Sequence, residues 1–317
     1  MNKFIIKRIL ICIPMMLVVI AIILVLVSFS KVDPGKMKLG TDATPEKVYE
    51  YNEAHGFYDP LPVKFVKFVG NIFKGDFGIS YYYDRPVWND IMQRWPHSLR
   101  VTFLGLIIAM TIGIPLGVLA AVKQYSLIDR IATTLSMFLS AIPVFAMSVI
   151  LMYIFSYRLK LVPASGIKNG WKSWVLPCAT LGIFYSARFL RFTRSTMLET
   201  IRQDYVQTAR AKGSSETVVI WKHAFRNALL PLITVTGTTL GTLIGGVVVI
   251  ETVFVIPGLG TLVVEALSRN DIPLVLAAIT ILAFTFLMIM LVVDIMYAVV
   301  DPRIRAKYRS TNRKKRK

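Results

Sequence analysis

Apolar and polar residues are separated along this chain into long blocks. Six apolar runs, most of them bounded by charged residues, lie near 9–30, 99–122, 131–156, 174–197, 229–250 and 274–300. A helix rises about 1.5 Å per residue, so about 20 apolar residues cross the roughly 30 Å hydrocarbon core of a bilayer. The pattern predicts an all-α polytopic membrane protein with six transmembrane helices. The run at 174–197 is the weakest, because its apolar part is short, contains Pro177 and ends in arginines.

The first apolar run has two interpretations. Residues 1–8 are basic and precede an apolar stretch, which is also the pattern of a secretory signal peptide. However, Ile9 to Ser30 is 22 residues long, enough to span roughly 33 Å as a helix. No small-x-small cleavage pattern follows Ser30 cleanly. We therefore expect residues 1–30 to form a cytoplasmic N-terminus and an uncleaved first span.

Residues 31–98 form a polar insert between the first and second spans. The insert holds nine Lys or Arg and nine Asp or Glu, so its net charge is zero. Two helices are expected in it, Pro45–Ala54 capped by Thr44 and an amphipathic Pro62–Phe73, each with proline in its first turn. The aromatic residues that follow could shape an external gate or simply pack the insert; they are Phe77, Tyr81, Tyr82 and Tyr83.

The distribution of charge predicts which side of the membrane each loop occupies. The chain is 55% hydrophobic and 17% charged, against roughly 25% charged residues in soluble proteins. Its net charge is +19, and positive charge is concentrated in the N-terminus, in the loops 122–131 and 188–228 and in the tail 301–317. The insert is neutral, the segment 251–273 is negative, and only the +4 loop at 156–173 breaks the pattern. Positive loops remain in the cytoplasm, so we expect both termini there and no nucleic-acid binding.

The most polar stretch inside the membrane region is 198–228. Asp204–Lys212 is rich in helix-forming residues, and Gly213 is a natural left-handed stop after them. Ser214 or Ser215 can cap a second short helix that begins near Glu216. Two short helices joined at a glycine indicate a docking element for a soluble partner. An amphipathic loop lying on the bilayer surface is the alternative.

Two spaced patterns lie in the later spans. Arg188, Arg191 and Arg194 recur every third residue along one side of a helix, where they could line a conduit or anchor the span at anionic headgroups. Small residues recur every fourth position in the fifth span, at Gly237, Gly241 and Gly245. Such a face lets another helix approach closely, although flexibility within a buried helix is the competing reading of each glycine.

No catalytic constellation is found in the sequence. It lacks HExxH, GxSxG and a pair of intramembrane aspartates. Cys12 and Cys178 have neither CxxC spacing nor nearby histidines, which argues against a disulfide or a metal site. The sequence also lacks a glycine-rich phosphate loop ending in Lys and Ser or Thr. We therefore expect no enzyme and no cofactor in this chain.

Four motifs carry a family resemblance, in the order Tyr205–Gly213, His223–Pro231, Glu251–Gly260 and Asp294–Arg305. Ala43–Glu46 and Gly75–Ser80 add a match within the insert. Together they resemble the B-type membrane subunit of the oligopeptide and dipeptide ABC importers, a group that also holds nickel and opine permeases. The resemblance covers nearly the whole chain.

The resemblance implies a type I importer fold in a bacterial cell membrane. Two permeases, a B-type and a C-type, would enclose the path for oligopeptides or dipeptides. Two cytoplasmic ATPases would power it by alternating access, and an extracellular lipoprotein or periplasmic binding protein would deliver the substrate. The resemblance also implies a coupling helix that docks on an ATPase; the residues concerned are Asp204, Tyr205, Gln207, Thr208, Ala209, Arg210, Ala211, Lys212, Gly213, Ser214 and Glu216.

The chain departs from the general importer pattern at one point, where Gln207-Thr208-Ala209 replaces Glu-Ala-Ala. This removes any expectation of a particular salt bridge to the ATPase, but not the docking itself. Nickel, a metallophore or an opine is the rival cargo, because substrate choice in such systems lies largely with the binding protein. A secondary transporter working without ATPases is the alternative from another class.

Overall fold

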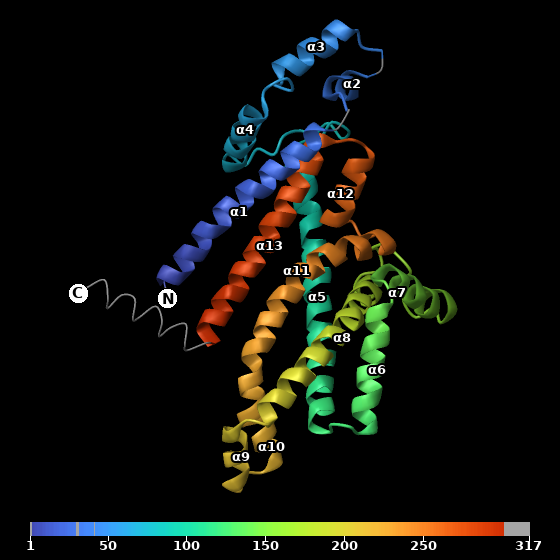
Figure 1. Ribbon diagram of the computed structural model, residues 1–317. Helices are drawn as coiled ribbons and strands as arrows, with labels where there is room; N and C mark the ends of the chain where they lie inside the picture. The colour runs from blue at the N-terminus through green and yellow to red at the C-terminus, as the bar shows by residue number, and fades with distance from the viewer. Residues whose placement is uncertain (1, 30–31, 41, 301–317) are drawn as a thin grey trace, which may run out of the picture. The chain divides into compact units, whose positions relative to one another are not determined.

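The computed structural model describes residues 2–29, 32–40 and 42–300 (Figure 1). The basic tail 301–317, expected to anchor the chain at the cytoplasmic surface, lies outside the described residues. Within the described part the chain is helical, with one isolated antiparallel bridge between Ile79 and Pro86. The helices are α1 Asn2–Ser28, α2 Pro34–Leu39, α3 Pro45–Ala54, α4 Leu61–Phe73, α5 Val87–Val122, α6 Leu127–Ala141, α7 Val144–Leu151, η1 Met152–Arg158, α8 Lys172–Ile201, α9 Asp204–Ala211, α10 Glu216–Val218, η2 Val219–Phe225, α11 Arg226–Phe254, α12 Leu259–Ser268 and α13 Ile272–Val300.

Four helical stretches in the described part are long and apolar enough to cross a membrane: Ile5–Ser28, Val87–Val122, Glu216–Phe254 and Ile272–Met296. They contain the spans expected at 9–30, 99–122, 229–250 and 274–300. The third is longer than the apolar run because α10, the π-helical η2 and α11 are continuous from Glu216. Proline at 231 lies inside α11, in line with the tolerance of membrane helices for proline.

The expected single span at 131–156 differs from the structure. It is divided into α6 and the α7–η1 pair, which meet at 103°. Ile142, between them, has extended backbone angles of φ −80° and ψ 127°. The reason is Pro143, because proline disfavours the helical conformation of the residue before it and supplies no N–H to continue the helix.

The expected span at 174–197 lies within α8, a helix of 30 residues. Helix α8 is long enough to cross a bilayer, but it is less apolar than the four helical stretches named above. Three arginines and several hydroxyl side chains lower its hydropathy. Its stability in a membrane therefore depends on the neighbours that receive those polar groups.

The described chain divides into two compact units. One contains Leu99–Ile256 and the end of α13 from Met288, and in it α8 contacts α6, α7 and α11 (Figure 1). Helices α5 and α8 approach each other closely at glycines. A Cβ atom at Gly113 would lie 2.5 Å from the Ser186 carbonyl oxygen, and one at Gly117 would lie 2.6 Å from Thr193 Cβ.

The other unit contains Ile6–Ser98 and Pro257–Leu287. Here α4 packs Phe65, Phe68 and neighbouring apolar residues against Ile20 and Ile23 of α1. Helices α3 and α4 agree with the two helices expected in the insert; Thr44 is the N-cap residue of α3, although its side chain makes no capping bond. The short α2 was not expected. Its N-cap Asp33 accepts hydrogen bonds from the backbone N–H groups of Gly35 and Lys36.

Candidate functional site

The polar segment forms one short helix, α9, followed after a glycine by α10, which is continuous with η2 and α11. The second short helix expected near Glu216 is therefore the start of a membrane-length helix, because no glycine or proline lies between Glu216 and Arg226. Helix α9 spans Asp204–Ala211, and Gly213 follows it with φ +79°, the left-handed conformation expected of the stop. Ser215 is the N-cap residue of α10 with extended angles, and its side chain makes no capping bond. The local sequence thus determined α9 and the turn that follows it, but not the continuation of the second helix into the membrane-length helix.

An apolar cluster holds this segment against the membrane-length helices of its own unit. Val206 and Ala209 of α9 are buried together with Val118 of α5, Met197 of α8 and Val219 of η2. Val206 and Ala209 are three residues apart, so both lie on one face of α9. Close side-chain packing therefore joins α9 to α5 and α8.

An ion pair links α9 to the first residue of α10. Arg210 Nε donates to Glu216 Oε1 at 2.8 Å, and its Nη2 donates to Oε2 at 3.3 Å. Both side chains are substantially exposed, so the pair contributes little stability in solvent. Its two parallel bonds nevertheless restrict the orientation of α9 relative to α10.

The outer face of α9 is polar and accessible. Tyr205 is 43% exposed, and Asp204, Gln207, Thr208, Ala211 and Lys212 are also exposed. Partial burial raises the pKa of the Tyr205 hydroxyl above its ordinary value, while a hydrogen bond with the Asn227 side chain opposes that shift. The remaining predicted docking residue, Ser214, is partly buried. The face presents mixed donors and acceptors around one aromatic ring, as a rigid docking surface does.

The arginine row of α8 reaches across to two neighbouring helices. Arg194 makes a bidentate ion pair with Asp129 of α6, at 2.5 and 2.8 Å. Arg191 donates to the Ser136 carbonyl at 2.7 Å and to Ser140 Oγ at 2.8 Å, both on α6. Sequence reasoning identified the arginines but not their partners, which lie 51 to 65 residues away.

Arg188 differs from the other two arginines. It donates to Thr238 Oγ1 at 3.2 Å and to Thr242 Oγ1 at 3.5 Å on α11. Neither partner carries a charge, so this guanidinium interacts with neutral oxygen atoms where Arg194 interacts with a carboxylate.

The aromatic residues predicted at the external gate occupy different environments. Phe77 is 8% exposed and stacks on Trp88 with ring centroids 5.1 Å apart, so it packs the insert. Tyr82 is 57% exposed and lies under the Arg269 guanidinium at 3.9 Å. Arg269 also donates to the Tyr83 hydroxyl at 2.7 Å. Only Tyr82 has the exposure that a gate residue requires, whereas Tyr81 lines a cavity.

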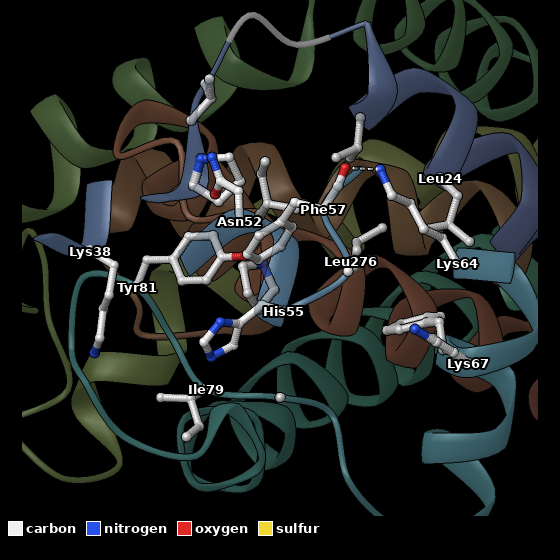
Figure 2. A pocket seen from close by; sticks show the side chains of 18 of the residues that line it. Leu24, Lys38, Asn52, His55, Phe57, Lys64, Lys67, Ile79, Tyr81 and Leu276 are labelled. Atoms are coloured by element: carbon white, nitrogen blue, oxygen red, sulfur yellow. Dashed lines mark hydrogen bonds between the residues drawn. The ribbon is translucent and has the colours of Figure 1, made fainter. Parts of the chain in front are cut away.

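That cavity has a volume of about 1030 Å³ and lies within the second unit (Figure 2). Tyr51, His55, Phe57 and Tyr81 form an aromatic group along it, and burial raises the pKa of Tyr81. Apolar residues such as Leu24 and Leu276 also line it, as do Lys38, Lys64 and Lys67. Lys67 pairs with Asp59 and Lys38 with Asp84, whereas Lys64 donates to the Phe57 carbonyl at 2.6 Å. No pattern in the sequence indicated this cavity.

Asp271 organises the loop that carries the tyrosines, and sequence reasoning missed it. This fully buried carboxylate accepts hydrogen bonds from the Ser80 hydroxyl and from the backbone N–H groups of Tyr81 and Tyr82, both at 3.2 Å. It also accepts from the N–H of Leu274 at 3.3 Å. The available signal was an aspartate one residue before Ile272-Pro273, which is a helix-start pattern.

Replacing Asp271 by alanine is expected to lower the stability of the purified protein by about 2–4 kcal/mol, because several buried donors lose their acceptor. Thermal unfolding of the detergent-purified complex measures the change. Asp76→Ala is the matched control, because Asp76 accepts one bond, from Gly78 N–H at 2.8 Å, in an exposed loop. Equal melting temperatures for the two variants would contradict the organising role of Asp271.

The glycines of α11 do not share one environment. A Cβ atom at Gly237 would lie 2.4 Å from Val293 Cγ1, so here α11 and α13 are in close contact. Gly241 is half-buried, whereas Gly245 is exposed with no atom within 4 Å of an added Cβ. Close helix approach therefore uses Gly237 on α11 and, more extensively, Gly113 and Gly117 on α5.

The described chain combines membrane-length helices with an exposed short helix, α9, as a membrane-spanning subunit that docks on a soluble partner would. Two family models match the chain. Residues 113–306 match the binding-protein-dependent transport system inner membrane component, and residues 1–102 match the N-terminal region of such membrane components. The chain belongs to this family, and it is a permease subunit of an ABC importer, a multi-pass protein of the inner membrane and not an enzyme.

The curated relatives extend the match along the whole chain. The glutathione transport system permease protein GsiC of Salmonella paratyphi A is 36% identical over 307 residues, covering 97% of this chain and 100% of the relative. The probable peptide ABC transporter permease protein y4tP of Sinorhizobium fredii is 36% identical over 312 residues, covering 96% and 100%. The expected membership of the peptide-type permeases is thereby confirmed.

Among solved structures, an inward-facing MetNI methionine ABC transporter has a chain that matches with a TM-score of 0.59 and 19% identity. The match covers 67% of this chain and 96% of that one. At this identity it establishes the fold alone, and it confirms the expected type I importer permease architecture.

Proposed function

We propose that this permease imports short peptides. The supporting observation is the full-length match to permeases whose names specify glutathione, itself a peptide, and peptides. Nickel, a metallophore or an opine is the second candidate within the same architecture. The lysines and aromatic rings of the cavity can contact the carboxylates and apolar side chains of a peptide. His55 and the carboxylates of Asp33, Asp76 and Asp84 line the same cavity and are ligand types that Ni²⁺ accepts, so the preference for peptides rests on the match to the relatives.

The assembly follows from family membership in outline: a partner permease, ATPases and a binding protein. We propose more specifically a C-type permease, two ATPases that hold ATP and Mg²⁺, and an extracellular lipoprotein or periplasmic binding protein. The insert at 31–98 would contribute to the surface on which the binding protein sits. The exposed ring of Tyr82 beside Arg269 is one of the aromatic groups available to such a partner.

We propose that both termini and the segment 198–228 face the cytoplasm, as the charge distribution supports. Helix α9 and the turn at Gly213 would then dock on an ATPase. Closure of the ATPase dimer would move α9, and the buried contacts of Val206 and Ala209 with α5 and α8 would pass the movement to the path. In this arrangement the polar interruption of the membrane region is the coupling element.

Affinity purification tests this assembly. When the chain is expressed with its native neighbours and a tag, we expect a second permease and two ATPase subunits to co-purify in equal proportion. Proteoliposomes containing that complex, supplied with binding protein and internal ATP, are expected to accumulate labelled short peptides and not Ni²⁺. A homodimer that transports without ATPases would instead indicate a secondary transporter.

A further inference from the structure

Arg188 is located near the middle of α8, the helix expected to cross the membrane at 174–197. A guanidinium at that depth is costly, by about 3 kcal/mol on insertion scales, unless it faces other protein groups or water. The arginine at 194 meets this requirement through Asp129. Arg188 contacts only the hydroxyl oxygens of Thr238 and Thr242 among the bonds described, and the described residues include no carboxylate in ion-pair contact with it.

The face of α11 beneath Arg188 is unusual for a membrane helix. Exposed small and hydroxyl residues recur there at spacings of four, four, three and seven, which places them on one side of the helix; they are Thr234, Thr238, Thr242, Gly245 and Thr252. A face exposed to lipid would be apolar instead. This stripe therefore borders water or polar protein, and a permease supplies both along its translocation path.

The hydroxyl hydrogens of this stripe are already used. Thr238 Oγ1 donates to the Val235 carbonyl at 3.1 Å, and Thr242 Oγ1 donates to the Thr239 carbonyl at 2.9 Å. Their lone pairs therefore accept from Arg188, orienting its guanidinium across the stripe. Since a guanidinium has five N–H donors and two nitrogens are engaged here, donors remain for an anion.

A second side chain of α8 borders the same place. The Tyr185 hydroxyl, one turn before Arg188, donates to the Thr242 carbonyl at 3.1 Å. A Cβ atom at Gly246 would lie 3.1 Å from that hydroxyl, so a larger residue would crowd the ring. Tyr185 and Arg188 thus lie side by side against a face of α11 that carries only small side chains.

We propose that Arg188, oriented by Thr238 and Thr242, is an anion subsite in the translocation path that contacts the carboxylate of the substrate in transit. This inference rests on the proposed import of peptides, which carry a terminal carboxylate. Guanidinium–carboxylate pairs are bidentate and strong when partly dehydrated. The substrate must also leave this site. Because the stripe is exposed, water can replace the carboxylate at the guanidinium when the substrate moves on.

The first test needs no substrate. In the complete complex, with Cys12 and Cys178 replaced by alanine, Gly245→Cys places a thiol on the stripe where an added Cβ meets no atom within 4 Å. Its reaction rate is measured with a negatively charged methanethiosulfonate reagent and with a positively charged one. We expect the anionic reagent to be favoured, and Arg188→Gln to reduce the ratio of the two rates about tenfold. An unchanged ratio, or a thiol that neither reagent reaches, would overturn the subsite.

Arg191→Gln is the matched control, one turn further along α8 with the same charge change. Arg191 is engaged with Ser136 and Ser140 of α6, so its loss is expected to leave the rate ratio at Gly245→Cys unchanged.

The second test measures uptake of tri-alanine and of its C-terminal amide by proteoliposomes with the same binding protein. Arg188→Gln is expected to reduce the preference for the free acid about tenfold relative to the unmodified complex, with Arg188→Lys intermediate. Because the binding protein is common to both complexes, its own preference cancels in this comparison. An equal preference in both complexes would overturn the carboxylate assignment. If the unmodified complex imports neither form while the thiol rates remain charge-dependent, the anion subsite stands and peptide import by this system fails.

Discussion

A Gly113→Val variant is expected to lose about 3 kcal/mol of stability and most of its yield of folded complex. The added Cβ would lie 2.5 Å from the Ser186 carbonyl oxygen and 2.6 Å from Phe189 Cβ. Overpacking of a core costs roughly 1–3 kcal/mol, and the upper end applies because one obstacle is backbone, which cannot change rotamer. Helices α5 and α8 would have to separate. Thermal unfolding of the purified complex, monitored by size-exclusion chromatography, measures the loss.

Gly70→Val in α4 is the matched control for this substitution. Gly70 is also a helical glycine, and an added Cβ meets no atom within 4 Å. Since valine has a higher helix propensity than glycine, this variant should be neutral or slightly stabilised. If both variants unfolded at the same temperature, close contact between α5 and α8 would not be the basis of the stability of this unit.

The second large effect is expected at the turn between α9 and α10. Gly213 has φ +79°, where a residue with a Cβ costs about 1–2 kcal/mol and a β-branched one more. Gly213→Val should therefore reorient the turn and remove α9 from its docking position. We expect ATP-driven uptake to fall at least tenfold, because about 1.4 kcal/mol taken from the docking equilibrium is already a factor of ten. Uptake and ATP hydrolysis are measured together in proteoliposomes.

Gly170→Val is the control that tells whether the effect of Gly213→Val comes from lost docking or from backbone strain alone. Gly170 has φ +58° and open space around an added Cβ, and it lies in the turn before α8 rather than in the docking segment. It should retain most of the uptake. Equal losses in the two variants would indicate general strain, and retained uptake in Gly213→Val would refute the coupling role of 204–216.

The features that could be predicted well from the sequence depend on interactions between residues close together in the chain. The stop at Gly213 and the helices at 45–54 and near 62–73 depend on residues within a few positions of each other. The break at Ile142 was equally local, since a proline restricts the residue before it. The sequence alone does not decide between a break and one span here, because membrane helices tolerate proline where neighbouring groups satisfy the freed backbone.

The partners of polar side chains could not be predicted from the sequence. Asp129 and Arg194 are 65 residues apart, and Ser80 and Asp271 are 191 residues apart. Periodicity places Arg188, Arg191 and Arg194 on one side of a helix but does not specify which helices pack there. The glycine contacts show the same limit: spacing favoured Gly237, Gly241 and Gly245, whereas the backbone of a neighbouring long helix comes closest at Gly113 and Gly117.

The arginine row of α8 also imposes an order on membrane insertion. Each arginine costs about 3 kcal/mol at the centre of an isolated inserting helix, so α8 does not enter the bilayer alone. Asp129, Ser136 and Ser140 precede α8 in the chain and are already synthesised when Arg191 and Arg194 emerge from the ribosome. The threonines that receive Arg188 follow in α11 and are made later. We therefore expect α8 to remain beside α6 during insertion until α11 supplies the threonines that accept hydrogen bonds from Arg188.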